Sequence, residues 1–414
     1  MRYLHQKKVP VEIKSMSFEN PAQIIRSWAL QGAFSSGAVV QDKLVPRKFA
    51  RIRTPFINTW RSEAVSSQLD WGVAAFSFYL PESLRVISSM FLEVPLPGLA
   101  GGSYKKIPGF HAIKTIRFLS AGQESYHCDV SQYLRDYVES CTAEEADRFL
   151  KTYLGYTTDA GTTTARTLHI PILLPNSAYM ARAGRDVRGH GIWPCYTGSN
   201  RLEIQITMGS ATELVKSAGN VPASISNTCN MMIHQVDMTS EDVQRYSDVR
   251  GQYSVITRRF TELTQGWTAA GSNVRQRLTQ SQPLGCVTEL FCIAVPTGTA
   301  EDHREIDTNV QTTHFSITSD SVTQKSLDSA AKCQMELWAN GFVGNSFCNS
   351  PSRLCFASHA AEAENLYTGG FNMQLSSQVT VEVEFAEAVD FRVYACQLQR
   401  VTVNSIGLIQ ASLD

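Results

Sequence analysis

The sequence predicts an all-β protein of antiparallel sandwiches or barrels, with a few short helices in the connections. Runs in which apolar and polar residues alternate recur along the chain, are rich in Val, Ile, Phe and Tyr, and are bounded by Gly, Pro, Asn or Ser. Such runs are typical of half-buried strands, and many short strands separated by turns are typical of sandwiches and barrels. The runs that predict strands are 74–80, 91–96, 112–119, 168–174, 201–208, 231–238, 253–260, 274–279, 290–295, 335–338, 378–385 and 391–398.

Two short segments are predicted to be helical, both between strands. In the segment 143–154, Thr142 is placed to cap the first turn, Glu145 is the third residue of a capping box, and Gly155 ends the helix. The segment 241–246, which follows Thr239 and Ser240, is the second candidate.

The length and a weak internal repeat indicate two domains. At 414 residues, the chain fits two domains of roughly 150 to 200 residues. FLEVPLP (91–97) and LFCIAVP (290–296) are both alternating runs closed by proline, and they begin 199 residues apart. One pair of short segments also arises by chance, so the pattern alone leaves a duplication open. The boundary is predicted near 246–251.

Composition and charge favour a folded chain that hides surface in itself or in partners. Apolar residues make up 43% and charged residues 18%, and the net charge of −1 argues against a dedicated nucleic-acid binder. Residues 1–53 hold ten Lys and Arg against three acids, a charge of +7, which leaves −8 for the rest. A basic arm of this kind suits an anionic neighbour such as membrane headgroups or nucleic acid, although a solvated arm explains it equally well.

Targeting signals and paired cysteines are both missing from the sequence. The first ten residues are basic and polar, and no apolar run approaches the roughly 20 residues that span a bilayer, so we expect a soluble protein made in the cytosol. The ten cysteines show neither C-x-x-C pairs nor zinc-like spacing to His, and we expect them to be small buried apolar residues in a reducing compartment.

No residue pattern predicts catalysis. The sequence has no P-loop, no G-x-G-x-x-G leading from strand to helix, no H-E-x-x-H and no G-x-S-x-G. His127 and Cys128 could form a base and a thiolate, but neighbours on a strand point to opposite faces. Aromatic residues do not interleave with Lys and Arg as a single-strand nucleic-acid face requires.

Three groups of acidic residues could form carboxylate pairs or bind a cation, and each has a simpler explanation. A solvated helix face explains the first group, a polar loop the second, and an exposed loop without the glycine turn of a calcium site the third. The groups are Glu144, Glu145 and Asp147; Glu362 and Glu364; and Asp302, His303, Glu305 and Asp307.

The segment 91–134 resembles the first jelly roll of the double jelly-roll major capsid proteins of nucleocytoplasmic large DNA viruses and their smaller relatives. That family has a strand ending in Pro-x-Leu, a Tyr, a Gly before a strand that ends in a Gly-Gln turn, and a helical segment containing Tyr. The matching residues here are Leu96, Pro97, Tyr104, Gly109, Ile113, Ile116, Gly122, Gln123 and Tyr126.

Further segments resemble the family in the same order, from about Leu80 to the C-terminus. They correspond to the later strands of the first jelly roll, its closing strand and acidic helix, the entry to the second jelly roll, and the strands of the second. These segments are 168–175, 201–208, 229–248, 253–260, 271–296, 368–374 and 390–410. The resemblance also accounts for the two proline-closed strands, which take equivalent places in two jelly rolls.

The resemblance implies an all-β fold of two tandem antiparallel jelly-roll sandwiches, the double jelly roll. The expected parts are a basic N-terminal arm (1–30), a first jelly roll (31–248) and a second jelly roll (249–414). It implies a structural major capsid protein, not an enzyme, with no cofactor and no metal. The chain is shorter than typical members and its final glycine-rich signature is reduced to one Gly, which leaves a minor or penton-like capsid protein, a scaffold protein, or a jelly-roll carbohydrate-binding module as alternatives.

The partners implied are other copies of the chain and the inner layers of a virus particle. Three copies would form a pseudo-hexagonal capsomer that contacts neighbouring capsomers and minor capsid proteins in an icosahedral shell, with the protein located in the virion and assembled in the host cytoplasm. We expect the arm to face inward, where Lys7, Lys8 and Lys14 could contact an internal membrane. No sequence-specific contact with nucleic acid is expected.

Overall fold

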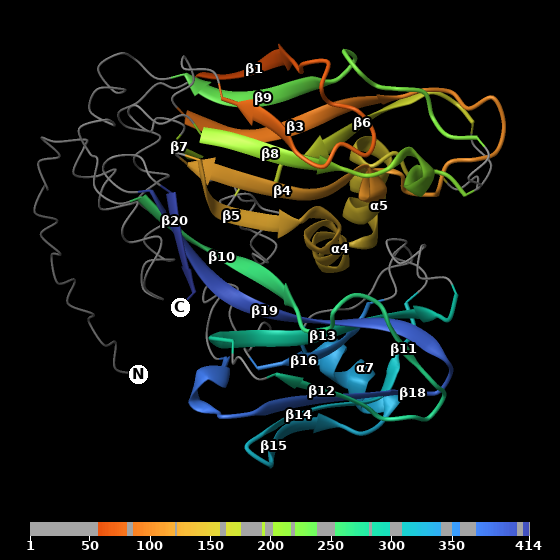
Figure 1. Ribbon diagram of the computed structural model, residues 1–414, viewed down its shortest axis with the longest axis vertical. Helices are drawn as coiled ribbons and strands as arrows, with labels where there is room; N and C mark the ends of the chain where they lie inside the picture. Colours follow the sequence, from red (N-terminus) through yellow and green to blue (C-terminus); the bar gives the residue numbers. More distant parts are fainter. Residues whose placement is uncertain are drawn as a thin grey trace, which may run out of the picture.

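The computed structural model describes most of the chain after the N-terminal region. The described residues are 57–80, 86–120, 122–157, 163–174, 193–194, 202–216, 220–237, 253–280, 284–298, 309–340, 350–356, 370–403 and 409–413. Figure 1 shows that they form two β-sandwiches, one above the other, with helices at the junction and on the second sandwich.

Two antiparallel sheets form the first sandwich. Sheet I has the strand order β1-β9-β3-β6, with β7 paired to β3, and sheet II has the order β2-β8-β4-β5. The strands of sheet I are β1 (Ile57–Ala64), β9 (Asn230–Asp237), β3 (Val86–Leu96), β6 (Arg166–Pro171) and β7 (Trp193–Pro194). Those of sheet II are β2 (Phe76–Tyr79), β8 (Leu202–Met208), β4 (Ile113–Ser120) and β5 (Gln123–Asp129).

The second sandwich is also made of two antiparallel sheets. Sheet III has the order β10-β19-β13-β16, with β11 and β20 on β19 and β17 on β13, and sheet IV has the order β12-β18-β14-β15. Sheet III contains β10 (Tyr253–Glu262), β19 (Val389–Val403), β13 (Cys286–Pro296), β16 (Ser352–Cys355), β11 (Thr268–Ala270), β17 (Phe371–Asn372) and β20 (Ile409–Leu413). Sheet IV contains β12 (Gln276–Gln280), β18 (Val379–Phe385), β14 (Thr312–Ser319) and β15 (Val322–Leu327).

The two sandwiches repeat one topology. In chain order, the first, ninth, third and sixth strands of the first sandwich form sheet I, and their counterparts β10, β19, β13 and β16 form sheet III in the same order. Sheets II and IV correspond in the same way. The proline-closed runs at 91–97 and 290–296 lie on β3 and β13, which are counterparts, so the structure supports the duplication that the sequence left open.

Helices occur mainly in the connections between strands. Both sandwiches place helices at the same point of the repeat: α4 and α5 lie between β5 and β6, and α7 lies between their counterparts β15 and β16. The helices are α3 (Gly109–Ala112), α4 (Val130–Ser140), α5 (Ala143–Tyr153) and α7 (Ala330–Ala339), with the 3₁₀ helices η1 (Ala211–Leu214) and η3 (Met373–Leu375).

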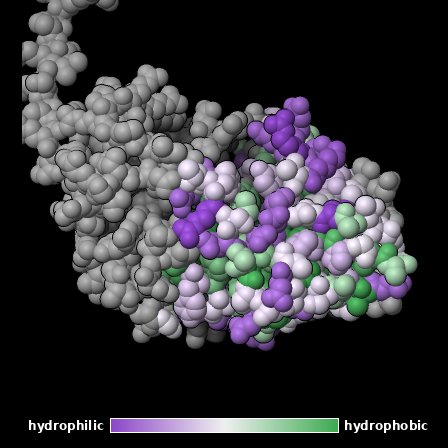
Figure 2. Space-filling model, turned by 90° about the horizontal axis from the view of Figure 1, so that it is seen from above, coloured by the Kyte–Doolittle hydropathy of each residue, from purple (hydrophilic) through white to green (hydrophobic). Residues whose placement is uncertain are grey.

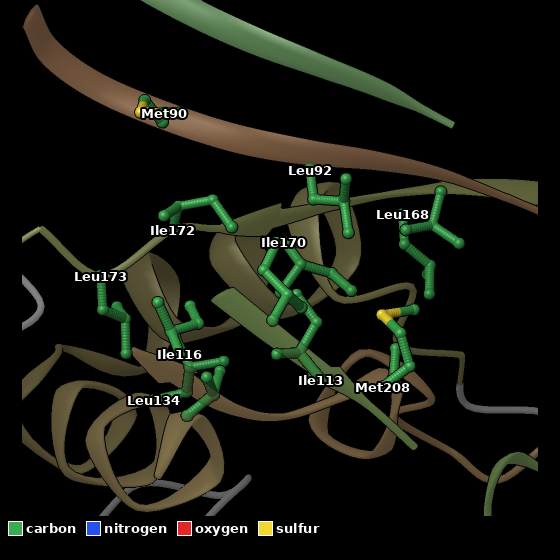
Figure 3. Close-up of a cluster of buried hydrophobic side chains, with 14 of the residues drawn as sticks. Met90, Leu92, Ile113, Ile116, Leu134, Leu168, Ile170, Ile172, Leu173 and Met208 are labelled. Atoms are coloured by element: carbon green, nitrogen blue, oxygen red, sulfur yellow. The ribbon is translucent and has the colours of Figure 1, made fainter. Parts of the chain in front are cut away.

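Each sandwich is held together by apolar side chains between its two sheets. Figure 3 shows this packing in the first sandwich, where Met90 and Leu92 of β3 lie over Ile113 and Ile116 of β4. Alternation produces the core directly, since β8 and β18 each bury every second residue. Burial of this apolar surface is the main favourable contribution to folding.

Strand β13 departs from the alternating pattern because both of its faces are covered. Every residue from Val287 to Val295 is buried, although a strand with one solvated face would bury only alternate residues. One face packs into the core of the second sandwich, and the other carries Phe291 and Ile293, which form a separate buried cluster with Tyr394. This outer face of sheet III is turned toward the first sandwich.

Most of the elements predicted from the sequence are confirmed. Within the described residues, every predicted strand except 335–338 overlaps an observed one. The helix at 143–154 is observed as α5, with both hydrogen bonds of the capping box between Thr142 and Glu145, and Gly155 follows with a φ of 69°. The predicted helix at 241–246 and the domain boundary at 248/249 lie outside the described residues.

The prediction of a strand at 335–338 is wrong, because these residues lie in α7. Only Met335, Glu336 and Leu337 alternate in polarity, and so short a segment does not distinguish a strand from a helix. The helical period is visible once Cys333 is included, since Cys333 and Leu337 lie four residues apart and are both buried. Ser329 caps the helix by accepting a hydrogen bond from the backbone N–H of Lys332.

Candidate functional site

Helix α4 forms the junction between the two sandwiches. It begins at Val130, directly after β5, because the carboxylate of Asp129 accepts hydrogen bonds from the backbone N–H and the hydroxyl of Ser131. Figure 1 shows α4 at the lower side of the first sandwich, next to the second. Val130, Leu134 and Val138 pack into the core of the first sandwich, so the opposite side of the helix is available to sheet III.

Aromatic contacts join α4 to the outer face of sheet III. The Tyr133 hydroxyl donates a 2.7 Å hydrogen bond to the backbone carbonyl of Arg258 on β10, and its ring lies 4.6 Å from that of Phe260. The contact continues across the sheet, with ring centroids 5.3 Å apart for Phe260 and Phe291 and 5.1 Å apart for Phe291 and Tyr394. These rings bury a large apolar area at the centre of the junction.

A network of buried ions surrounds the aromatic contact. Asp136 and Glu139 come from α4, Arg258 from β10, Glu289 from β13 and Arg353 from β16. Arg353 lies 3.2 Å from Asp136 and 3.1 Å from Glu289, and it also pairs with Glu139. Arg258 pairs with Asp136 and lies 3.8 Å from Glu289. The guanidinium of Arg353 therefore binds two carboxylates of the first sandwich and one of the second.

The network is removed from solvent. Arg353 is 1% exposed, and the other four side chains are at most 4% exposed. Arg135 of α4 is also buried, which balances three acids with three arginines in this region. An uncompensated charge at such a site would carry a large desolvation cost, so pairing is a condition for burying any of these groups.

Burial and the neighbouring opposite charges shift the pKa values of the network in opposite directions. Burial raises the pKa of Glu139, and Arg353 works against that rise. Burial alone would lower the pKa of Arg353, but Glu139, Glu289 and Asp136 offset this, and its pKa lies above the usual range of arginine. The guanidinium groups are therefore charged at every pH at which the protein is folded.

The end of strand β19 adds a second contact between the sandwiches. Strand β19 is 15 residues long, and Val401 near its end belongs to the core of the first sandwich. Strands β10 and β20, which pair with β19, contact β5 of sheet II. The two sandwiches thus form one continuous packed body within the described residues.

The His127 and Cys128 pair is not a nucleophile and base. On β5 the two side chains face opposite ways, His127 toward solvent and Cys128 into the core, where it is 2% exposed. Burial raises the pKa of the Cys128 thiol, which disfavours the thiolate. His127 instead lies 3.3 Å from Glu124.

The carboxylates of α5 have structural roles. Glu145 closes the capping box with Thr142, and Asp147 pairs with Lys151 one turn later. Among the described residues, no group of His, Cys, Asp and Glu could hold a metal ion. The acidic groups at 302–307 and 362–364 lie outside the described residues. So do Lys7, Lys8 and Lys14 of the predicted arm.

All cysteines in the described part of the chain are free thiols. Most are buried, and Cys141 and Cys286 are half-buried. This agrees with the expectation that they act as small apolar residues.

The residues of the junction were not identified from the sequence. Asp136 and Arg353 are 217 positions apart, and a charged residue on a short helix is normally solvated. The one local signal is the continuous apolar run of β13, which indicates a strand covered on both faces.

Loss of Arg353 should destabilise the protein strongly. We expect Arg353→Met to lower the free energy of unfolding by about 3 kcal/mol or more, because Glu139 and Glu289 remain buried without their main partner. The measurement is denaturant unfolding of both proteins at one chain concentration. Arg277→Met is the matched control, since Arg277 pairs with Glu382 but is 71% exposed; it should change stability by less than about 0.5 kcal/mol. Equal stability of the Arg353 variant and wild type would contradict the role of the network.

Comparison with known proteins supports the fold through structure alone. No family model and no curated protein sequence matches the chain. The structure is similar to the PBCV-1 virus capsid with a TM-score of 0.64 and 11% identity, over 88% of this chain and 97% of that chain. It is similar to the Faustovirus major capsid protein with a TM-score of 0.54 and 9% identity, over 84% and 91% of the two chains. It is similar to the mavirus major capsid protein with a TM-score of 0.53 and 11% identity, over 86% of this chain and 90% of that chain. The chain therefore has the double jelly-roll fold of these capsid proteins.

Proposed function

We propose that this protein is a major capsid protein that forms the shell of an icosahedral virus. The observation that carries the proposal is the tandem repeat of one sandwich, held as a single body by a buried junction and similar to capsid proteins over most of both chains. Repetition of one building block suits a closed shell, which needs many similar contacts from few kinds of surface.

Three copies would supply six similar sandwiches around one axis. A trimer of this kind has a nearly six-fold outline, so one protein can tile flat facets through near-equivalent contacts with neighbouring capsomers. Such a protein would assemble through buried surface and complementary shape, without making or breaking a covalent bond. The low share of charged residues, 18%, agrees with a chain that buries much of its surface in assembly.

Contacts between capsomers would be more polar than contacts within one. Figure 2 shows the molecule from the β1 end of Figure 1, and on the described part of this face hydrophobic residues lie in small groups among hydrophilic ones. Surfaces of this composition are typical of interfaces that form between already folded units. The protein would be located in the virion, after assembly in the host cytoplasm.

The mass of the native protein tests this proposal. We expect light scattering to give about three times the chain mass of 45.8 kDa, and negative-stain images of the same sample to show a pseudo-hexagonal ring. A stable, folded monomer at 45.8 kDa would contradict the proposal and would favour the alternative of a binding module.

The basic arm is proposed to contact the inner side of the shell. Residues 1–53 carry a charge of +7, and lysines near an anionic surface contribute about 1 kcal/mol each to binding. Among the described residues, no helix is long and apolar enough to cross a bilayer. With its charge of +7, the arm would attach to an internal membrane or to minor capsid proteins by electrostatic attraction.

Replacing the arm lysines should weaken vesicle binding without affecting the trimer. We expect Lys7→Gln/Lys8→Gln/Lys14→Gln to reduce binding to phosphatidylserine-containing vesicles by about 100-fold at low salt. The matched control changes three exposed lysines of the described body, Lys151→Gln/Lys216→Gln/Lys332→Gln. Equal binding by wild type and the arm variant, or an equal loss in the control, would contradict the proposal. The proposal would also be contradicted if deletion of residues 1–20 left the trimer, particle assembly and attachment to the inner layer unchanged.

A further inference from the structure

The repeat makes α7 the counterpart of α4. Helix α4 lies in the connection from β5 to β6, and α7 lies in the connection between their counterparts, β15 and β16. In α4, the side chains that face sheet III include Gln132, Asp136 and Glu139, which are spaced i, i+4 and i+7. This spacing places them on one side of the helix. The corresponding side of α7 has no such partner among the described residues.

That side of α7 is apolar and exposed. Ala331, Met335 and Trp338 have the same i, i+4, i+7 spacing, and all three are exposed, Met335 by 66% and Trp338 by 74%. The opposite side, with Cys333 and Leu337, is buried in the second sandwich. A helix that is apolar on both sides is normally buried on both sides. Trp and Met are also among the residues enriched at the cores of protein interfaces.

Sheet I is the counterpart of sheet III, and its outer face carries a similar set of rings. In sheet III the set is Phe260, Tyr394 and Phe291, on β10, β19 and β13. In sheet I the equivalent strands β1, β9 and β3 carry the second set, which consists of Trp60, His234 and Phe91. Trp60 stacks on His234 at 4.6 Å and lies 6.0 Å from Phe91.

The two sets differ in what covers them. The rings of sheet III are covered by α4 through Tyr133, and Phe291 and Tyr394 are almost fully buried. On sheet I, Tyr153 of α5 stacks on Phe91 at 5.4 Å and His234 is half-buried, but Trp60 is 55% exposed. The chain thus has one helix face and one sheet face that match the two halves of its internal junction, with Met335 and Trp338 exposed on the first and Trp60 exposed on the second.

We propose that α7 of one copy packs on the outer face of sheet I of the next copy, with Met335 and Trp338 against Trp60, His234 and Phe91. The contact between copies then repeats the contact that joins the two sandwiches within a chain. This inference rests on the homotrimer proposed above, and goes beyond it by naming the two faces that meet.

A contact between two different faces of identical copies is head-to-tail, and such contacts close into rings when the rotation permits. The internal junction and the contact between copies would alternate around the ring, so that three chains place six sandwiches around one axis. The two contacts also differ in polarity, as expected from how each one forms. The internal junction is rich in ions and joins parts already linked by the chain, whereas separate copies need the larger hydrophobic gain of an apolar contact.

Charged substitutions on either face should separate the copies. We expect Met335→Glu/Trp338→Glu on α7, and separately Trp60→Glu on β1, to raise the dissociation constant of the trimer by about 30-fold or more. Light scattering over a range of micromolar concentrations measures this, with circular dichroism as the check that each variant is folded. Leu375→Glu is the matched control, because Leu375 is 84% exposed on the same sandwich but lies in η3, outside both faces. It should remain trimeric.

A mixture of the two variants tests the pairing itself. The Trp60 variant keeps an intact α7, and the α7 variant keeps an intact sheet I, so one contact can form between them. We expect the mixture to give a 1:1 dimer of about twice the chain mass and no trimer. An isologous contact, in which the same face of each copy meets, would not produce this complementation.

The outcomes separate this inference from the proposed function. Monomeric wild-type protein would contradict the homotrimer itself. Trimeric wild type with both face variants also trimeric would overturn the inference and leave the homotrimer intact. Loss of the trimer in the Leu375 control, or a mixture that stays monomeric, would show that these faces do not meet each other.

Discussion

The burial of Arg353 between the two sandwiches is the constraint on which the rest of the structure depends. Its guanidinium reaches Asp136 and Glu139 of the first sandwich and Glu289 of the second, and it is 1% exposed. Buried ion pairs add little net stability compared with apolar packing, but they are directional, and a displaced partner leaves a buried charge uncompensated. The network therefore favours a single orientation of one sandwich on the other. The rings of Tyr133 and Phe260 contribute apolar burial at the same junction.

The proposed role as a shell subunit requires a fixed orientation between the two sandwiches of the chain. If the step from the first sandwich to the second were variable, a trimer would not present six regular faces, and contacts along a facet would lose their near equivalence. The repeat gives each chain a second sheet with the strand order of sheet III, which is sheet I, and a second helix in the place of α4, which is α7. A single packing solution, present once within the chain and again between chains, would account for a ring of six sandwiches.

Much of the fold was predictable, because one buried face leaves a period of two in the sequence. Strands β8 and β18 alternate throughout, and the capping box of Thr142 and Glu145 marks α5. The strand predicted at Met335 was wrong because the helical spacing of Cys333 and Leu337 extends beyond the four residues considered. The junction was missed for a different reason. Burial of Asp136 and Arg353 depends on a contact between distant parts of the chain, and no local pattern distinguishes a buried charged side chain from a solvated one.

Hydrogen exchange measured by mass spectrometry tests most directly whether the two sandwiches form one body. We expect the amides of α4 (130–140) and β16 (352–355) to exchange as slowly as those of the core strands β3 and β13, since the junction would open only when the sandwiches unfold. Faster exchange of α4 and β16, with β3 and β13 still protected, would show that the junction opens independently and would contradict the account.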